Sequence, residues 1–187
     1  MVNKNYNFYS FFLVGVITLL YSFSIEKEIY DINIPKAEGG VQSLGNFSGK
    51  KIMIITLPIN TSLASDSLLY SLDSLARNRT GSLQVIAVPA IEDGFNLTNK
   101  SALMQWYRQF LGSYIVITDG IYCRKGSSSQ HPLFKWLTNI DENEIFEYDV
   151  EGPNFKYFVN TKGKLFGLLK SEISIKGSLV QKLLSLP

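Results

Sequence analysis

Lys51-Ile52-Met53-Ile54-Ile55-Thr56-Leu57 (KIMIITL) is a short, isoleucine-rich run of mainly apolar residues. Such a run is typical of a strand at the centre of a sheet, where both faces are buried. Ser65-Asp66-Ser67 follows as a predicted helix start, and leucines recur behind it at helical spacing. A buried strand followed by an amphipathic helix predicts the beginning of an α/β unit.

The same alternation continues along the chain. Leu83–Val88 (LQVIAV) predicts a second central strand, and Tyr114–Thr118 (YIVIT) predicts a third. Between them, a helix is predicted from Thr98 or Asn99 to Phe110. Strands that alternate with helices favour a sheet whose central strands are parallel.

The last third of the chain predicts a hairpin between two helices. Pro132 fits the first position of a short helix that reaches Leu137. Residues 155–159 and 165–168 flank a turn sequence, and leucines and a valine in residues 179–184 form one helical face. Together with a strand pair expected within Glu26–Asn46, around Ile29–Ile34, these elements predict an α/β fold with a central mixed sheet flanked by helices.

The N-terminal segment has a different composition. Between Lys4 and Glu26 lie 21 uncharged residues with an apolar centre. At about 1.5 Å per residue a helix of this length spans about 30 Å, the thickness of a bilayer core. We therefore expect residues 1–25 to form a transmembrane anchor or signal peptide, with membrane contact through residues 8–23. Residues 26–187 are expected to form one α/β domain.

Two membrane interpretations remain open, and the anchor is favoured. Ser22-Phe23-Ser24 supplies small residues for a weak signal-peptide cleavage site. The only positive groups before the apolar run are Lys4 and the α-amino group, whereas Glu26-Lys27-Glu28 follows it. This bias favours a cytoplasmic N-terminus, with the domain outside the cytoplasm. If the segment is cleaved, the protein is secreted.

The composition excludes several classes of site. One cysteine, Cys123, and one histidine, His131, allow no intramolecular disulfide, no Cys-x-x-Cys pair and no multi-ligand zinc or histidine centre. A net charge of +2 on 187 residues gives no electrostatic case for nucleic acid. We expect no metal and no cofactor.

Four phrases occur in a characteristic order along the chain. They are Leu44–Lys50 (LGNFSGK), Leu83–Pro89 (LQVIAVP), His131–Leu137 (HPLFKWL) and Asn154–Lys164 (NFKYFVNTKGK). In sequence and spacing they resemble the glutathione peroxidase branch of the thioredoxin-fold superfamily, over roughly residues 30–184. The resemblance implies a thioredoxin-like fold and, for an intact member, thiol-dependent reduction of peroxides.

The residues at the family's catalytic positions are altered. The resemblance places the reactive thiol at the end of the first core strand, where this sequence has Thr61, with Ser62 beside it. The family's glutamine falls on Glu92, and its Trp-Asn pair falls on Gly152-Pro153 or, with one gap, on Pro153-Asn154. A hydroxyl is not ionised near neutral pH and is a poor nucleophile toward peroxide. The resemblance therefore implies a catalytically degenerate member, with Thr61, Glu92 and Asn154 as the equivalent positions.

Cys123 has two interpretations. Arg124 and Lys125 follow it directly, and adjacent cations favour a reactive thiolate. Its position does not match the family's nucleophile, which favours a structural cysteine.

Pro153 stands where thioredoxin folds often place a cis proline, and His131 fits a helix cap better than a catalytic or ligand position.

Three functions follow as alternatives. The first is a membrane-anchored, extracytoplasmic glutathione peroxidase-like protein that binds an unknown partner or small ligand, or has a structural role, without catalysis. The second is an active thiol peroxidase that uses Cys123 in a rearranged site. The third is a tethered thioredoxin-like interaction module unrelated to redox chemistry.

Overall fold

The computed structural model describes residues 29–186, and the predicted N-terminal apolar segment lies outside this range. Its five-stranded sheet has the order β5-β4-β3-β6-β7. The strands are β3 (Lys51–Leu57), β4 (Leu83–Pro89), β5 (Val116–Ile117), β6 (Lys156–Val159) and β7 (Leu165–Leu169). β3, β4 and β5 run parallel, whereas β6 is antiparallel to both β3 and β7. The predicted mixed sheet is confirmed.

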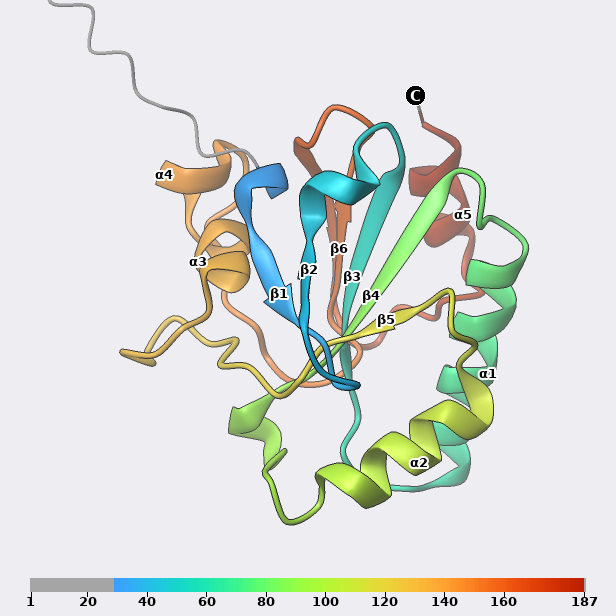
Figure 1. Cartoon of the computed structure of the whole chain (residues 1–187). Helices are drawn as coiled ribbons and strands as arrows, with labels where there is room; N and C mark the ends of the chain where they lie inside the picture. Colours follow the sequence, from blue (N-terminus) through green and yellow to red (C-terminus); the bar gives the residue numbers. More distant parts are fainter. Residues whose placement is uncertain (1–28, 187) are drawn as a thin grey trace, which may run out of the picture.

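Helices cover both faces of this sheet (Figure 1). The α-helices are α1 (Leu63–Arg77), α2 (Lys100–Phe110), α3 (Pro132–Thr138), α4 (Ile140–Asn143) and α5 (Ser178–Ser185). Three short 3-10 helices, η1 (Ile29–Asp31), η2 (Leu44–Phe47) and η3 (Ile91–Asp93), lie in the connections. No described helix is long and apolar enough to cross a membrane.

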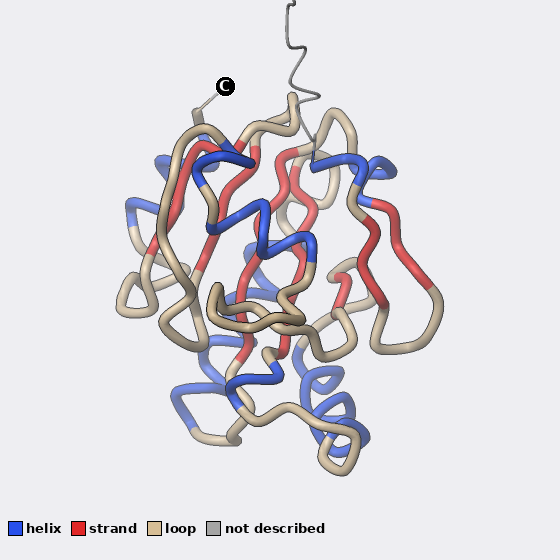
Figure 2. The backbone as a smooth tube through the Cα atoms, turned by 90° about the vertical axis from the view of Figure 1, so that its left-hand side faces the viewer, coloured by secondary structure: helices blue, strands red, loops and turns tan. Residues whose placement is uncertain are grey.

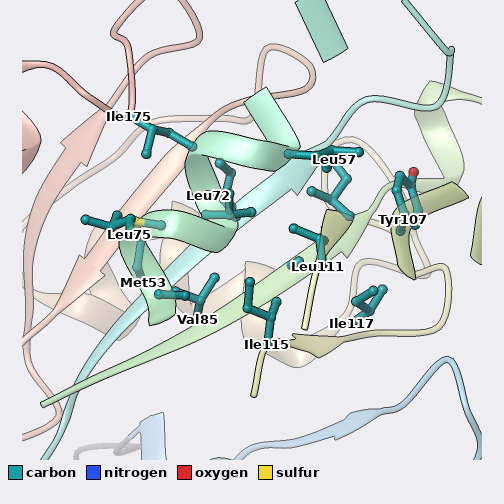
Figure 3. Packing of buried hydrophobic residues seen from close by; sticks show 14 of the residues in the cluster. Met53, Leu57, Leu72, Leu75, Val85, Tyr107, Leu111, Ile115, Ile117 and Ile175 are labelled. Atoms are coloured by element: carbon teal, nitrogen blue, oxygen red, sulfur yellow. The ribbon is translucent and has the colours of Figure 1, made fainter. Parts of the chain in front are cut away.

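The alternation of side chains along β3 and β4 creates two cores. Met53, Ile55 and Leu57 point to the face covered by α1, α2 and α5. Figure 3 shows how Leu72 and Leu75 of α1 pack over Met53 and Val85 there. Ile52 and Ile54 point to the opposite face, where α3 and the N-terminal strands pack. Because β3 and β4 serve both cores, their apolar runs show no alternation in the sequence.

The strand pair predicted within residues 26–46 is present, and its strands lie in the later part of that range. β1 (Asn33–Pro35) pairs with β2 (Val41–Ser43) as a separate antiparallel sheet, and Ile29–Asp31 forms η1 instead of a strand. In Figure 2, viewed from the side of α3, helices cross in front of the main sheet and the small hairpin lies beside it.

Two other boundaries differ from the predictions. The third strand was expected over Tyr114–Thr118, but β5 contains only Val116 and Ile117. The Gln84 side chain donates a hydrogen bond to the Tyr114 carbonyl (3.1 Å), which takes that group out of the strand ladder. α1 begins at Leu63 rather than near Ser65, because the Ser62 hydroxyl caps it by accepting a hydrogen bond from the Ser65 N–H (3.1 Å).

Candidate functional site

The loop between β3 and α1 carries the position where the resemblance expects a thiol. Thr61 lies in this loop with an exposed side chain, one residue before the helix cap. The neighbouring Ser62 hydroxyl is used by α1: it accepts from the Ser65 N–H, and the two serine hydroxyls are 2.9 Å apart. The N-terminus of α1 is therefore satisfied by a neutral hydroxyl, and no ionisable group stands at this position.

Glu92, in η3 just after β4, binds the backbone of another loop. Its carboxylate accepts hydrogen bonds from the Cys123 N–H (2.8 and 3.0 Å) and from the Arg124 N–H (2.7 Å). A carboxylate that accepts several N–H bonds fixes the loop in place. Glu92 thus holds the loop around Cys123 against η3.

Asp93 strengthens the same contact with an ion pair. Its Oδ1 lies 2.5 Å from the Arg124 guanidinium, and its side chain is only 10% exposed. Burial raises the pKa of Asp93, the guanidinium of Arg124 opposes that rise, and the neighbouring Glu92 adds to it. Asp93 Oδ2 is buried without a hydrogen-bond partner. The sequence reasoning did not identify Asp93, since an acidic residue beside Glu92 gives no signal of burial.

The Cys123 thiol is fully buried, with no exposed surface. Its Sγ lies 3.6 Å from the Ile121 carbonyl oxygen, to which it donates a weak hydrogen bond. Burial raises the pKa of this thiol well above its usual range, and the Glu92 and Asp93 carboxylates raise it further. Of the flanking cations, Arg124 lowers the pKa of the thiol but is itself paired with Asp93, and Lys125 is paired with Glu147. The effect that the sequence predicts for the two cations is therefore outweighed by burial and by the carboxylates.

Asn154 is held by the end of β3 and by the chain after β7. It has a left-handed backbone (φ 65°), its N–H donates to the Thr56 carbonyl (2.7 Å), and its side-chain amide donates to the Ser171 carbonyl. No described residue follows a cis peptide bond, so Pro153 is trans. Asn154 thus connects the end of β3 to the start of β6 by hydrogen bonds.

Two buried polar residues stabilise this connection between β3 and β6. The Thr56 hydroxyl donates to the Gly152 carbonyl (2.8 Å) and accepts from the Phe155 N–H (2.9 Å). The Lys156 ammonium, on a residue with no exposed surface, donates to the Asn154 carbonyl, to Asn154 Oδ1 (3.1 Å) and to the Lys170 carbonyl (3.2 Å). The sequence offered a weak signal for Thr56, which is a polar residue inside the apolar run of β3, but none for Lys156, which is the first residue of β6.

His131 fulfils the capping role predicted for it. It is the N-cap of α3, and its Nδ1 accepts a hydrogen bond from the Leu133 N–H (3.2 Å). Burial lowers the pKa of His131, which favours the neutral ring that this acceptor role requires.

The structure brings only some of the predicted site residues into contact. Glu92 contacts the Cys123 backbone directly, and Asn154 is joined to β3 through Thr56. Within residues 29–186, no hydrogen bond or ion pair connects Thr61 with Glu92, Cys123 or Asn154, and no three His, Cys, Asp or Glu side chains gather as a metal site requires. The arrangement provides exposed hydroxyls at the strand ends and an inaccessible thiol.

The protein is similar to known proteins in its three-dimensional structure but not in its sequence. No protein-family model and no curated protein sequence matches the chain. Among solved structures, the chain is similar to the glutathione peroxidase Trgpx in apo form (TM-score 0.61, 15% identity, covering 86% of this chain and 97% of that one). It is also similar to T. cruzi GPX1 (TM-score 0.59, 15% identity, covering 84% and 95%).

A third similar structure is the exposed lipoprotein thioredoxin Etrx1 from Streptococcus pneumoniae strain TIGR4 (TM-score 0.51, 16% identity, covering 83% and 99%). At such identities the likeness establishes the fold alone. The described part of the chain therefore has the thioredoxin-like fold, in an arrangement that it shares with glutathione peroxidase structures.

Proposed function

We propose that this protein is a glutathione peroxidase-like binding protein, anchored outside the cytoplasm, that does not reduce peroxides. One observation carries the proposal: an exposed threonine stands at the position where the resemblance expects the thiol, while the lone cysteine is fully buried, with its N–H bonded to Glu92. Peroxide reduction by a thiol enzyme requires an accessible thiolate. Cys123 is neither exposed nor easily ionised.

The experiment is a peroxide-consumption assay on the full chain, with and without glutathione or thioredoxin. We expect the wild-type protein to match the buffer control and Cys123→Ser to be indistinguishable from it. Thr61→Cys is expected to label readily with an alkylating reagent, because position 61 is exposed. Turnover well above buffer that disappears in Cys123→Ser would contradict the proposal and favour the thiol-peroxidase alternative.

The anchoring part of the proposal rests on the uncharged N-terminal run, which lies outside the described residues. We expect the full chain to remain with membranes after carbonate washing and to be released by detergent. Protease added to the outside of cells should digest the domain. Recovery of a shortened soluble chain outside the cell would instead support a cleaved signal peptide.

A further inference from the structure

A pocket of about 210 Å³ lies between the C-terminal half of α1 and the beginning of α5. Leu75 and Ile175 give it an apolar floor, and both are almost fully buried. Its polar lining consists of Ser71, Ser74, Asn78, Arg79, Lys176 and Gln181. Figure 1 shows α1 and α5 side by side on the sheet face that they share. This pocket belongs to neither Thr61 nor the Glu92–Cys123 contact.

The lining contains two cations and no carboxylate. Arg79 donates one hydrogen bond to Gln181 Oε1 (3.0 Å), which leaves its other guanidinium donors available. The Lys176 ammonium lies 5.9 Å from the centroid of the Tyr70 ring. Among the described residues, no carboxylate pairs with Arg79 or Lys176.

The surrounding sequence also lacks acidic residues. No Asp or Glu occurs in residues 74–91 or in residues 173–187, the two segments that contain Arg79 and Lys176. The acidic residue just before the first segment, Asp73, is fully engaged by Arg77, by the Tyr114 hydroxyl and by the Gly112 N–H (2.9 Å). The acidic residue just before the second segment, Glu172, interacts electrostatically with Lys156 and Lys170. The lining of the pocket itself therefore carries two cations without a paired carboxylate.

The first turn of α5 adds a further favourable group. α5 starts between two lining residues, Lys176 and Gln181, and its N-cap, Gly177, offers no side chain to the free N–H groups of that turn. The N-terminal end of a helix carries partial positive charge and attracts anions. A second hollow of about 190 Å³ also has Arg79 in its lining, together with Lys51, Ser82 and Thr161. Arg79 thus serves two adjoining hollows.

We propose that the α1–α5 pocket binds a phosphate- or sulfate-type oxyanion, either free or as the charged group of a larger molecule. Arginine offers a planar fork of donors that matches phosphate oxygens, and lysine adds a point charge. The Ser74 hydroxyl and the amides of Asn78 and Gln181 supply the remaining donors, whereas the Ser71 hydroxyl already donates to the Ser67 carbonyl (2.6 Å). The pocket accommodates an inorganic phosphate with room for bridging waters or an attached group, since one water occupies about 30 Å³.

The test uses the full chain in a phosphate-free maltoside detergent. The first probe is inorganic phosphate, followed by ³¹P NMR relaxation, with chloride at equal ionic strength as the comparison. The second probe is monomeric dihexanoyl phosphatidylglycerol, with dihexanoyl phosphatidylcholine as its neutral counterpart. We expect saturable binding of at least one anionic probe. The probe that binds more tightly identifies the source of the anion.

Variants separate the pocket from general surface charge. Arg79→Gln with Lys176→Gln should weaken binding at least about tenfold, since each charge-assisted hydrogen bond is worth about that factor or more. Ser74→Glu, which places a carboxylate in the pocket, should abolish binding. Lys135→Gln on α3, an exposed lysine on the opposite sheet face, should leave it unchanged.

Circular dichroism first establishes that each variant is folded. Absence of saturable binding by either anionic probe would overturn the proposal. So would binding that survives both the double substitution and Ser74→Glu in folded protein, or binding that Lys135→Gln weakens equally.

Discussion

Lys156 is a single buried residue that makes the stability of the protein depend on pH. Its ammonium is fully buried and is held by carbonyl and amide oxygens instead of by a contacting carboxylate. Burial lowers the pKa of Lys156 from 10.5 to about 8, against a weaker opposing effect of Glu172. In the unfolded chain the amine stays protonated up to about pH 10.5, so between these two values the unfolded state binds more protons. Stability from this residue therefore rises with pH across that window.

We predict that the free energy of unfolding increases by about 2 kcal/mol between about pH 7 and pH 9.5 because of this one group. Lys156→Met should remove this increase, and Lys162→Met, which changes an exposed lysine in the neighbouring hairpin, should retain it. Urea unfolding at a series of pH values measures the slope. Equal slopes in wild type and Lys156→Met would contradict the assignment.

Connecting segments, rather than strands, carry the feature that most distinguishes this site. η3 presents Glu92 and Asp93 to the loop that follows β5. Glu92 accepts from the backbone N–H groups of Cys123 and Arg124, and Asp93 pairs with the Arg124 side chain. Both N–H groups donate to one carboxylate oxygen, Glu92 Oε1 (2.8 and 2.7 Å), and Oε2 is a second acceptor for the Cys123 N–H (3.0 Å). A glutamine could place its amide oxygen where Oε1 lies, but its NH₂ group would then face the Cys123 N–H and the negative charge would be lost. The residue that the resemblance expects at this position would therefore hold the same loop through weaker, neutral hydrogen bonds.

We predict that Glu92→Gln lowers the free energy of unfolding by about 1–2 kcal/mol, because a neutral acceptor makes weaker hydrogen bonds to the two N–H groups than a carboxylate does. Alkylation of Cys123 under native conditions should become faster, because the loop around Cys123 is then held by weaker hydrogen bonds and opens more often. Glu172→Gln, at an exposed carboxylate away from this loop, is the matched control. An alkylation rate in Glu92→Gln that equals that of the control would show that other contacts keep Cys123 buried.

The elements that were predicted correctly are those whose signal is local. The apolar runs of β3 and β4 and the HPLFKWL phrase of α3 depend on neighbours within a few residues. The start of α1 was misplaced because Ser62 and Ser65 both fit a cap, and only the actual hydrogen bond distinguishes them.

The site depends on contacts between distant parts of the chain, and local patterns do not contain these. Arg124 and Lys125 beside Cys123 suggested an activated thiol, yet their charges are taken by Asp93 and Glu147. A lysine in a strand normally indicates an exposed face, and nothing near Lys156 in the sequence shows that oxygen acceptors from Asn154 and Lys170 surround it. Such features require the fold before they can be recognised.

The two cores on opposite faces of the sheet should behave as one cooperative unit, because both are built on β3 and β4. The chain contains two tryptophans, and each reports on a different core. Trp106 of α2 packs on the α1 side and donates to Asp66 (2.8 Å), whereas Trp136 of α3 packs on the opposite side. Fluorescence of each tryptophan therefore follows the unfolding of one face.

We predict that Trp106→Phe and Trp136→Phe each unfold in a single transition. In each variant, the denaturant midpoint from the remaining tryptophan should coincide with the midpoint from far-ultraviolet circular dichroism. The two variants need not have equal stability, since each removes volume from a different core, so each is compared with its own dichroism curve. A core that separated first would require its helices to leave strands whose other face stays packed, which would expose the apolar side chains of β3 and β4 to water. Midpoints that differ between the two probes in either variant would show that the faces unfold separately.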